Sequence, residues 1–133
     1  MQKQKGFTII ELIVVIAIIA VLAAIVLVNV TQYINKGKDA AARGNLSTLL
    51  TNSAVYVDGG GTLAAFTTSP TGASVTAALT TAGYATAIGV PATTGWCASI
   101  TLKADTSKSY CVDSSGSKKE SATAICAATT CPN

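Results

Sequence analysis

Few side chains in this chain of 133 residues could carry chemistry. One is Glu11, the only charged residue in a long apolar segment near the N-terminus, and the others are four cysteines in the last third, Cys97, Cys111, Cys126 and Cys131. A carboxylate among apolar residues is costly unless it finds a partner, so Glu11 is a candidate for a functional contact. Cysteines form disulfides, bind metals or act as nucleophiles.

The composition does not favour an enzyme active site or a metal site. The chain has no His and two Glu, and we find no nucleophile–base pair, paired carboxylates or metal-ligand cluster in it. The cysteines are separated by 13, 14 and 4 residues and lack the close pair that is typical of structural zinc sites. We therefore predict no catalytic residue, no metal and no cofactor.

The segment around Glu11 has the composition of a membrane helix. Glu11 is the only charge between Phe7 and Val30, and every residue from Leu12 to Val28 is apolar. At about 1.5 Å per helical residue, this run nearly crosses the ~30 Å hydrocarbon core of a bilayer. In a simple membrane helix, Glu11 would extend to the headgroups beside Lys3 and Lys5.

Two ordinary explanations of this segment must be weighed. A secretory signal has an apolar region of about 7–15 residues and an A-x-A cleavage site. Here the apolar run is longer and contains no A-x-A. A plain single-pass anchor would account for the apolar run, but not for the residues immediately before it.

Those residues, Lys5-Gly6-Phe7-Thr8-Ile9-Ile10-Glu11, resemble the leader junction of type IV prepilins and pseudopilins. In that family a prepilin peptidase cleaves after the Gly and N-methylates the new N-terminal Phe, and the Glu anchors filament assembly. The resemblance implies cleavage after Gly6 and methylation of Phe7. It also implies that the Glu11 carboxylate meets the N-terminal amine of Phe7 in a neighbouring copy.

Residues 1–6 would then be a leader that is removed. The leader contains Lys3 and Lys5, so its removal lowers the formal net charge from +3 to +1. A nearly neutral protein has no strong electrostatic attraction to nucleic acid, and no specific nucleic-acid partner is predicted.

A long helix is predicted over roughly residues 7–57. No Gly or Pro lies between Phe7 and Lys36, and apolar residues recur at helical spacing beyond that segment. Residues 7–30 form the membrane anchor or filament core, and residues 31–58 form the amphipathic half. Gly37 and Gly44 lie on nearly one face, where they would allow close packing or bend the helix. The triple glycine at residues 59–61 ends it.

The remaining residues form a small head. Residues 59–94 are predicted to be a connecting loop with a short helix near 74–82 and a strand near Tyr84 to Val90. In residues 95–133, the segments Trp96 to Leu102 and Ser109 to Asp113 alternate apolar and polar residues, which predicts two antiparallel strands. A third strand is expected at Ser121 to Cys126.

A hairpin centred on Ala104 would place Cys97 directly opposite Cys111. Four cysteines permit three pairings, and this register favours the disulfide Cys97–Cys111, which leaves Cys126–Cys131 as the second. Free buried thiols are the alternative. The same register puts one set of side chains on the face toward the helix, namely Trp96, Ala98, Ile100, Leu102, Tyr110 and Val112.

These elements predict an α+β chain in which the second half of a long N-terminal helix packs on a three- to four-stranded antiparallel sheet, and the resemblance implies the type IV pilin fold. The resemblance implies a structural subunit of a type IV pilus-like filament. It would lie in the cytoplasmic membrane with its head outside the cytoplasm, and then enter an extracellular helical homopolymer. Its partners would be prepilin peptidase, membrane lipid, the cytoplasmic-membrane assembly machinery and copies of itself.

Two alternatives remain open. One is a pseudopilin of a secretion or DNA-uptake apparatus. The other is a membrane-anchored monomeric binding module, which would keep residues 1–6.

Overall fold

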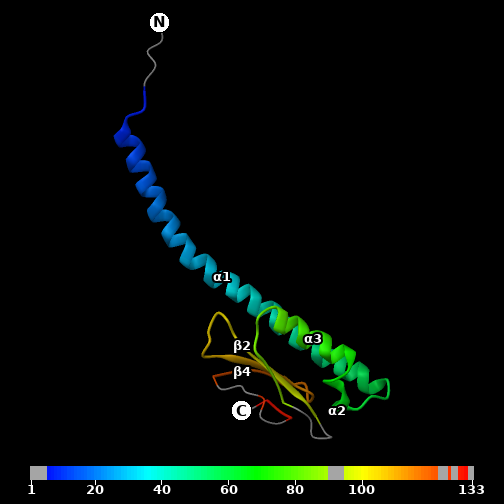
Figure 1. Cartoon of the computed structure of the whole chain (residues 1–133). Helices are drawn as coiled ribbons and strands as arrows, with labels where there is room; N and C mark the ends of the chain where they lie inside the picture. The colour runs from blue at the N-terminus through cyan, green and yellow to red at the C-terminus, as the bar shows by residue number, and fades with distance from the viewer. Residues whose placement is uncertain (1–5, 90–94, 123–125, 127–128, 132–133) are drawn as a thin grey trace. The chain divides into compact units, whose positions relative to one another are not determined.

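The computed structural model describes residues 6–89, 95–122, 126 and 129–131. The chain divides into two compact units, Met1–Ile34 and Asn35–Asn133, and helix α1 contributes to both. Figure 1 shows the order of the elements, with α1 at the N-terminal end and the strands toward the C-terminal end. The architecture is α+β, as the sequence predicts.

Helix α1 spans Ile9–Asp58, close to its predicted bounds. Its apolar part, which belongs to the first unit, has a mean hydropathy of 3.3 over its most apolar window, and none of that window is buried. By length and composition, this part of α1 could cross a membrane.

The end of α1 depends on the triple glycine. The N–H groups of Gly59 and Gly61 donate to the carbonyl oxygens of Val55 at 3.0 Å and Tyr56 at 2.9 Å. Between them Gly60 has φ of +89°, a left-handed conformation that glycine adopts without steric cost. The helix therefore ends where the sequence predicts, because the glycines can turn the chain and satisfy the last carbonyl groups.

Two helices follow in the second unit. The first, α2 at Leu63–Phe66, is a single turn that the sequence analysis did not predict. The second, α3 at Pro70–Thr81, begins earlier than the predicted residue 74. The reason is local, because the Ser69 hydroxyl accepts the N–H of Gly72 at 3.2 Å and proline occupies the first helical position.

The sheet has four antiparallel strands in the order β1-β2-β3-β4. Their bounds are Thr86–Gly89 for β1, Cys97–Thr101 for β2, Ser109–Asp113 for β3 and Lys118–Ser121 for β4. The third strand that was expected at Ser121 to Cys126 instead lies at Lys118–Ser121, as β4. The turn after β3 is tight, because the Gly116 N–H donates to the Asp113 carbonyl oxygen. The chain therefore pairs with β3 from Lys118 onward, three residues before the predicted start at Ser121. Residues 123–125 lie outside the described part of the chain.

The predicted register of the β2–β3 hairpin was also wrong. Ser99, not Cys97, lies opposite Cys111, and Cys97 lies opposite Asp113. The connection is closed by the Leu102 N–H, which donates to the Lys108 carbonyl oxygen at 2.9 Å, so the hairpin is centred on Asp105. A shift of two positions leaves each side chain on its predicted face, because side chains alternate with period 2.

The core of the second unit lies between the sheet and the second half of α1. Ala42, Leu46 and Leu49 of α1 are buried on one helical face. They join the inner face of the sheet and residues from the connecting segment, namely Trp96, Ala98, Ile100, Leu102 and Val112 with Phe66, Leu79 and Tyr84. The predicted packing of the sheet on the second half of the helix is therefore confirmed.

Candidate functional site

The predicted processing site lies immediately before α1. Gly6, Phe7 and Thr8 are not helical and are exposed, with 82% of Phe7 accessible to solvent. A Cβ atom on Gly6 would meet nothing within 4 Å, so packing within the described chain does not require glycine there. The bond between Gly6 and Phe7 thus lies in an accessible, non-helical segment, as a peptidase substrate must.

Thr8 and Glu11 form a reciprocal cap at the start of the helix. The Thr8 main-chain N–H donates to Glu11 Oε2 at 2.8 Å, and the Thr8 hydroxyl donates to the same oxygen at 2.7 Å. In return, the Glu11 N–H donates to Thr8 Oγ1 at 3.3 Å. This is a capping box, in which two N–H groups without helical partners are satisfied by side chains.

The cap was not found by sequence reasoning, although its signal was present. The pattern Thr-x-x-Glu before an apolar run is the sequence signature of a capping box. Its consequence is that Glu11 has a partner inside its own chain, and that its carboxylate is held toward the helix N-terminus rather than along the apolar face.

Both bonds that Glu11 accepts end on Oε2. Within the described residues, Oε1 accepts no hydrogen bond, and a carboxylate oxygen can accept two. Glu11 can therefore serve a second donor that comes from outside the chain.

The helix around this cap exposes its apolar side chains on every side. Between Phe7 and Val30 the large apolar side chains that the structure describes are 44% to 82% exposed. Exposed apolar surface of this extent marks a membrane or protein interaction site. The first unit therefore combines an accessible bond between Gly6 and Phe7, an oriented carboxylate and an exposed apolar helical segment.

In the second unit a buried carboxylate joins three elements. Asp39 of α1 is 4% exposed, and its Oδ1 accepts the Tyr84 hydroxyl at 2.7 Å and the Lys103 N–H at 2.8 Å, while its Oδ2 accepts the Ala104 N–H at 2.8 Å. Burial opposes ionisation, but the N–H groups of Lys103 and Ala104 and the Tyr84 hydroxyl outweigh it and hold the pKa of Asp39 below its ordinary value. Asp39 thus ties Tyr84 and the β2–β3 connection to α1.

The charged residues beside Asp39 pair with one another. Arg43 Nη2 lies 2.7 Å from Glu120 Oε2, and Lys108 Nζ lies 3.8 Å from Glu120 Oε1 and 3.6 Å from Asp105 Oδ2. These four side chains are 35% to 51% exposed, so the pairs contribute little stability. Their mutual pairing leaves little unbalanced charge for a ligand.

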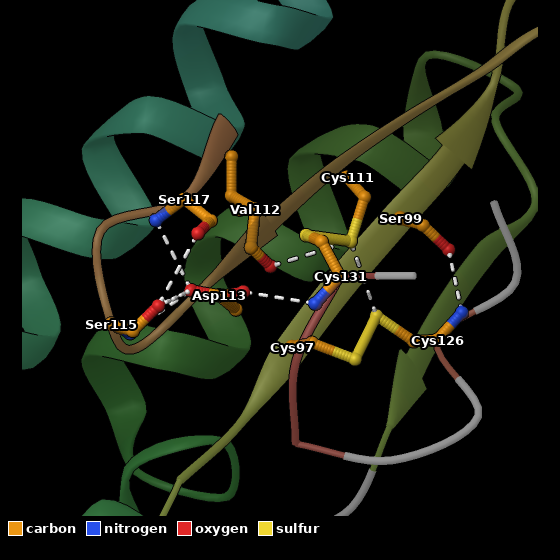
Figure 2. Close-up of a disulfide and its surroundings, with 9 residues drawn as sticks. All are labelled: Cys97, Ser99, Cys111, Val112, Asp113, Ser115, Ser117, Cys126 and Cys131. Carbon is orange, nitrogen blue, oxygen red and sulfur yellow. Dashed lines mark hydrogen bonds between the residues drawn. A yellow bond between two sulfur atoms is a disulfide. The ribbon is translucent and has the colours of Figure 1, made fainter. Parts of the chain in front are cut away.

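The predicted disulfide pairing was wrong. Cys97 is bonded to Cys126 and Cys111 to Cys131, with no free cysteine. The hairpin register explains the error, because Cys97 and Cys111 are not opposite each other. Both cysteines do lie on the outer face of the sheet, where Cys126 and Cys131 supply a partner to each (Figure 2).

Each C-terminal cysteine is held at two points. Cys126 is bonded to Cys97 and donates its N–H to the Ser99 hydroxyl at 3.3 Å. Cys131 is bonded to Cys111 and donates its N–H to Asp113 Oδ2 at 2.9 Å. In both cases the two contacts lie two residues apart on one strand, and therefore on one face of the sheet.

Asp113 is the second buried carboxylate of the head. It is 1% exposed, and Ser115 and Ser117 donate their N–H groups to its Oδ1 at 3.0 Å and 3.1 Å. Burial would raise the pKa of Asp113, but the N–H of Cys131 and the donors from Ser115 and Ser117 hold it below its ordinary value.

Comparison with known proteins identifies the N-terminal segment. Residues 1–27 match the family model described as the prokaryotic N-terminal methylation motif, so this segment is similar to the N-terminus of a prepilin-like protein. Neither a curated protein nor a solved structure matches the chain.

Proposed function

We propose that this protein is a structural subunit of a type IV pilus-like surface filament. The observation that carries the proposal is the arrangement of the first unit. The methylation motif at residues 1–27 includes the exposed apolar start of α1, and Glu11, the one carboxylate between Phe7 and Val30, is held at the helix start by Thr8.

Processing would act on the bond between Gly6 and Phe7. A prepilin peptidase would cleave there and N-methylate Phe7, and the resulting chain would begin with a positively charged amine. Exposure of Phe7 and the start of α1 at Ile9 support this step, because the scissile bond lies outside the helix.

Assembly would then pair the new amine with Glu11 of a neighbouring subunit. Oε2 of Glu11 is occupied by Thr8, so the amine would donate to Oε1. In a bundle of apolar helices, such a charge-assisted hydrogen bond is strong, and a mispositioned subunit would leave a buried charge without a partner. The contact would therefore set the axial position of each subunit.

The apolar helix would serve two environments in succession. In the cytoplasmic membrane it would anchor the subunit, with the head outside the cytoplasm. In the filament it would pack against the same helix of other copies, and the transfer would cost little because lipid and a helix bundle are comparably apolar. The assembly machinery of the cytoplasmic membrane would supply the work of extraction.

The head supports a pilin more than a pseudopilin. Two disulfides and two buried, fully bonded carboxylates make a small head resistant to unfolding, which suits a fibre that persists outside the cell. A monomeric binding module is less well supported, because the charged side chains beside Asp39 pair with one another.

The proposal is tested by expressing the full chain in a host with a prepilin peptidase and a pilus assembly system. The intact mass should correspond to a chain that starts at N-methyl-Phe7, and the sheared surface fraction should contain filaments. Glu11→Gln should be cleaved normally but absent from that fraction. Glu120→Gln is the matched control, because it makes the same change in the head, and it should assemble.

An uncleaved chain that begins at Met1 would instead support the monomeric binding module. Normal filament yield from Glu11→Gln would remove the assembly role of this carboxylate.

A further inference from the structure

The two disulfides of the head touch each other. The Sγ atoms of Cys111 and Cys126, which belong to different disulfides, lie 3.8 Å apart (Figure 2). The Sγ atoms of Cys97, Cys111 and Cys126 all lie within 4.8 Å of one another, and Cys131 is not part of this triplet. The sulfur atoms are buried, with Cys97 and Cys111 at 0% exposure and Cys126 and Cys131 at 7%.

We propose that these four cysteines form an internal exchange unit, in which opening either disulfide transfers the remaining bond to the pair Cys111–Cys126. This inference concerns the head alone and does not depend on the filament role.

The exchange balances without a net change of oxidation state once one bond is open. A small dithiol reduces Cys111–Cys131 and is itself oxidised to its disulfide. The Cys111 thiol loses its proton to water, and the thiolate attacks Sγ of Cys126. A Cys111–Cys126 bond forms, the Cys97–Cys126 bond breaks, and Cys97 leaves as a thiolate that takes up a proton.

Opening the other disulfide leads to the same product. Reduction of Cys97–Cys126 leaves Cys126 as the thiol in contact with Cys111. Its thiolate attacks Sγ of Cys111, and Cys131 leaves. Both routes end with one Cys111–Cys126 bond and two thiols, Cys97 and Cys131.

Burial favours exchange inside the head over attack by external thiols. External thiols reach a buried disulfide poorly, whereas the neighbouring sulfur is already 3.8 Å away and needs only to turn into line with the bond that it attacks. The first reduction should therefore be slow, and the exchange that follows should be fast by comparison.

Two polar residues oppose the exchange in the intact head. Ser99 and Asp113 hold the N–H groups of Cys126 and Cys131, each beside the strand that carries the native partner. We therefore assign them as positioning residues for the native pairing. They act through the cysteines and do not take part in the exchange.

The wild-type chain in detergent provides the first test. It is treated with a small dithiol below stoichiometry, quenched with acid, alkylated and mapped by peptide mass spectrometry. Species with one disulfide should include a Cys111–Cys126 bond with alkyl groups on Cys97 and Cys131. If every such species retains only Cys97–Cys126 or only Cys111–Cys131, the exchange unit is wrong.

Two single variants provide a matched comparison. Cys131→Ser leaves Cys111 as a free thiol inside the triplet, so both Cys97–Cys126 and Cys111–Cys126 should be found. Cys111→Ser leaves Cys131 as the free thiol outside the triplet, so only Cys97–Cys126 should be found. The same mixture in both variants, or Cys97–Cys111 in place of Cys111–Cys126, would overturn the assigned route. Should either variant fail to fold, the wild-type map decides.

The positioning role has its own readout. Asp113→Asn keeps a side chain that can accept the Cys131 N–H but removes the charge, whereas Asp113→Ala removes the acceptor. The fraction of Cys111–Cys126 bond after partial reduction should be higher for Asp113→Ala than for the wild type, and Asp113→Asn should lie between them. Equal fractions in all three proteins would show that Asp113 only stabilises the fold.

Discussion

The hydroxyl of Tyr84 donates a buried hydrogen bond of 2.7 Å to the carboxylate of Asp39. This bond connects Tyr84, three residues after the end of α3, to the second half of α1. The main-chain N–H groups of Lys103 and Ala104, in the β2–β3 connection, donate to the same carboxylate. Lys103 also donates through Nζ to the Ala82 carbonyl oxygen at 2.7 Å, at the C-terminus of α3, and lies 4.6 Å from the centre of the Tyr84 ring. The connecting segment, the sheet and the helix therefore meet at Asp39.

Removing this carboxylate should destabilise the head strongly. Asp39→Ala leaves the Tyr84 hydroxyl and two N–H groups without their acceptor, which should cost about 3–5 kcal/mol, whereas Tyr84→Phe removes one bond to a charged group and should cost about 1.5–3 kcal/mol. Denaturant unfolding of the full chain in detergent measures both values. Asp58→Asn, at the exposed end of α1, is the control and should change the free energy of unfolding little. Equal stability of Asp39→Ala and the wild type would contradict the role of Asp39.

The stability of the head should fall in acid. The pKa values of Asp39 and Asp113 are held below the ordinary value in the folded protein. Their stabilisation is therefore fully present above the unfolded pKa of about 3.9 and is lost as the pH falls from there through the lower folded values. Between neutral pH and about pH 5 the melting temperature should change little on account of these groups.

The double variant Asp39→Asn/Asp113→Asn isolates these two groups. It should be less stable than the wild type at neutral pH, and its melting temperature should vary less below about pH 4, because neither side chain then takes up a proton on unfolding. A melting curve that falls as steeply in acid as that of the wild type would assign the acid sensitivity to other carboxylates.

Thr8 should matter for assembly through Glu11. Thr8→Val keeps the shape of the side chain but loses the hydroxyl, which should weaken the start of α1 by about 1 kcal/mol and release one of the two bonds to Oε2. We expect lower filament yield at unchanged cleavage, while Thr8→Ser should retain both. Intact mass reports cleavage and the sheared fraction reports assembly. Full assembly of Thr8→Val would show that the cap has no part in filament formation.

Two glycines of α1 should be replaceable with a gain in stability. A Cβ atom on Gly37 or Gly44 would meet nothing within 4 Å, and neither residue has a positive φ. Gly37→Ala and Gly44→Ala should therefore each stabilise the second unit by about 0.5–1 kcal/mol through helix propensity. Thermal unfolding of the full chain in detergent provides the measurement.

Gly72→Ala is the contrasting substitution for this experiment. A Cβ atom there would overlap the carbonyl oxygen of Phe66, so it should destabilise the head by about 1–3 kcal/mol. If Gly37→Ala or Gly44→Ala lowered the melting temperature, helical packing in the chain would need that glycine.

Several features of the protein could be predicted from short stretches of its sequence. The motif from Lys5 to Glu11 and the apolar run after it depend only on neighbouring residues, and the motif at residues 1–27 bears out that reading. The helix end at the triple glycine is local too. The alternation of Trp96, Ala98, Ile100 and Leu102 correctly identified the inner face of the sheet, because strand periodicity determines which face a side chain occupies.

Only the tertiary structure decided which residues pair with one another in the hairpin, in the disulfides and at Asp39. The alternation of side chains predicts which face of the sheet a residue occupies, but it does not distinguish hairpin registers that differ by two residues. Cys97 and Cys111 were therefore predicted on the correct face but opposite the wrong residues. The pairing of Cys97 with Cys126 and of Cys111 with Cys131 joins residues that are 29 and 20 positions apart in the sequence. The meeting of Asp39 with Tyr84 and Lys103 likewise joins parts of the chain far apart in sequence. Periodicity and capping act over a few residues, whereas these contacts exist only once the chain has folded.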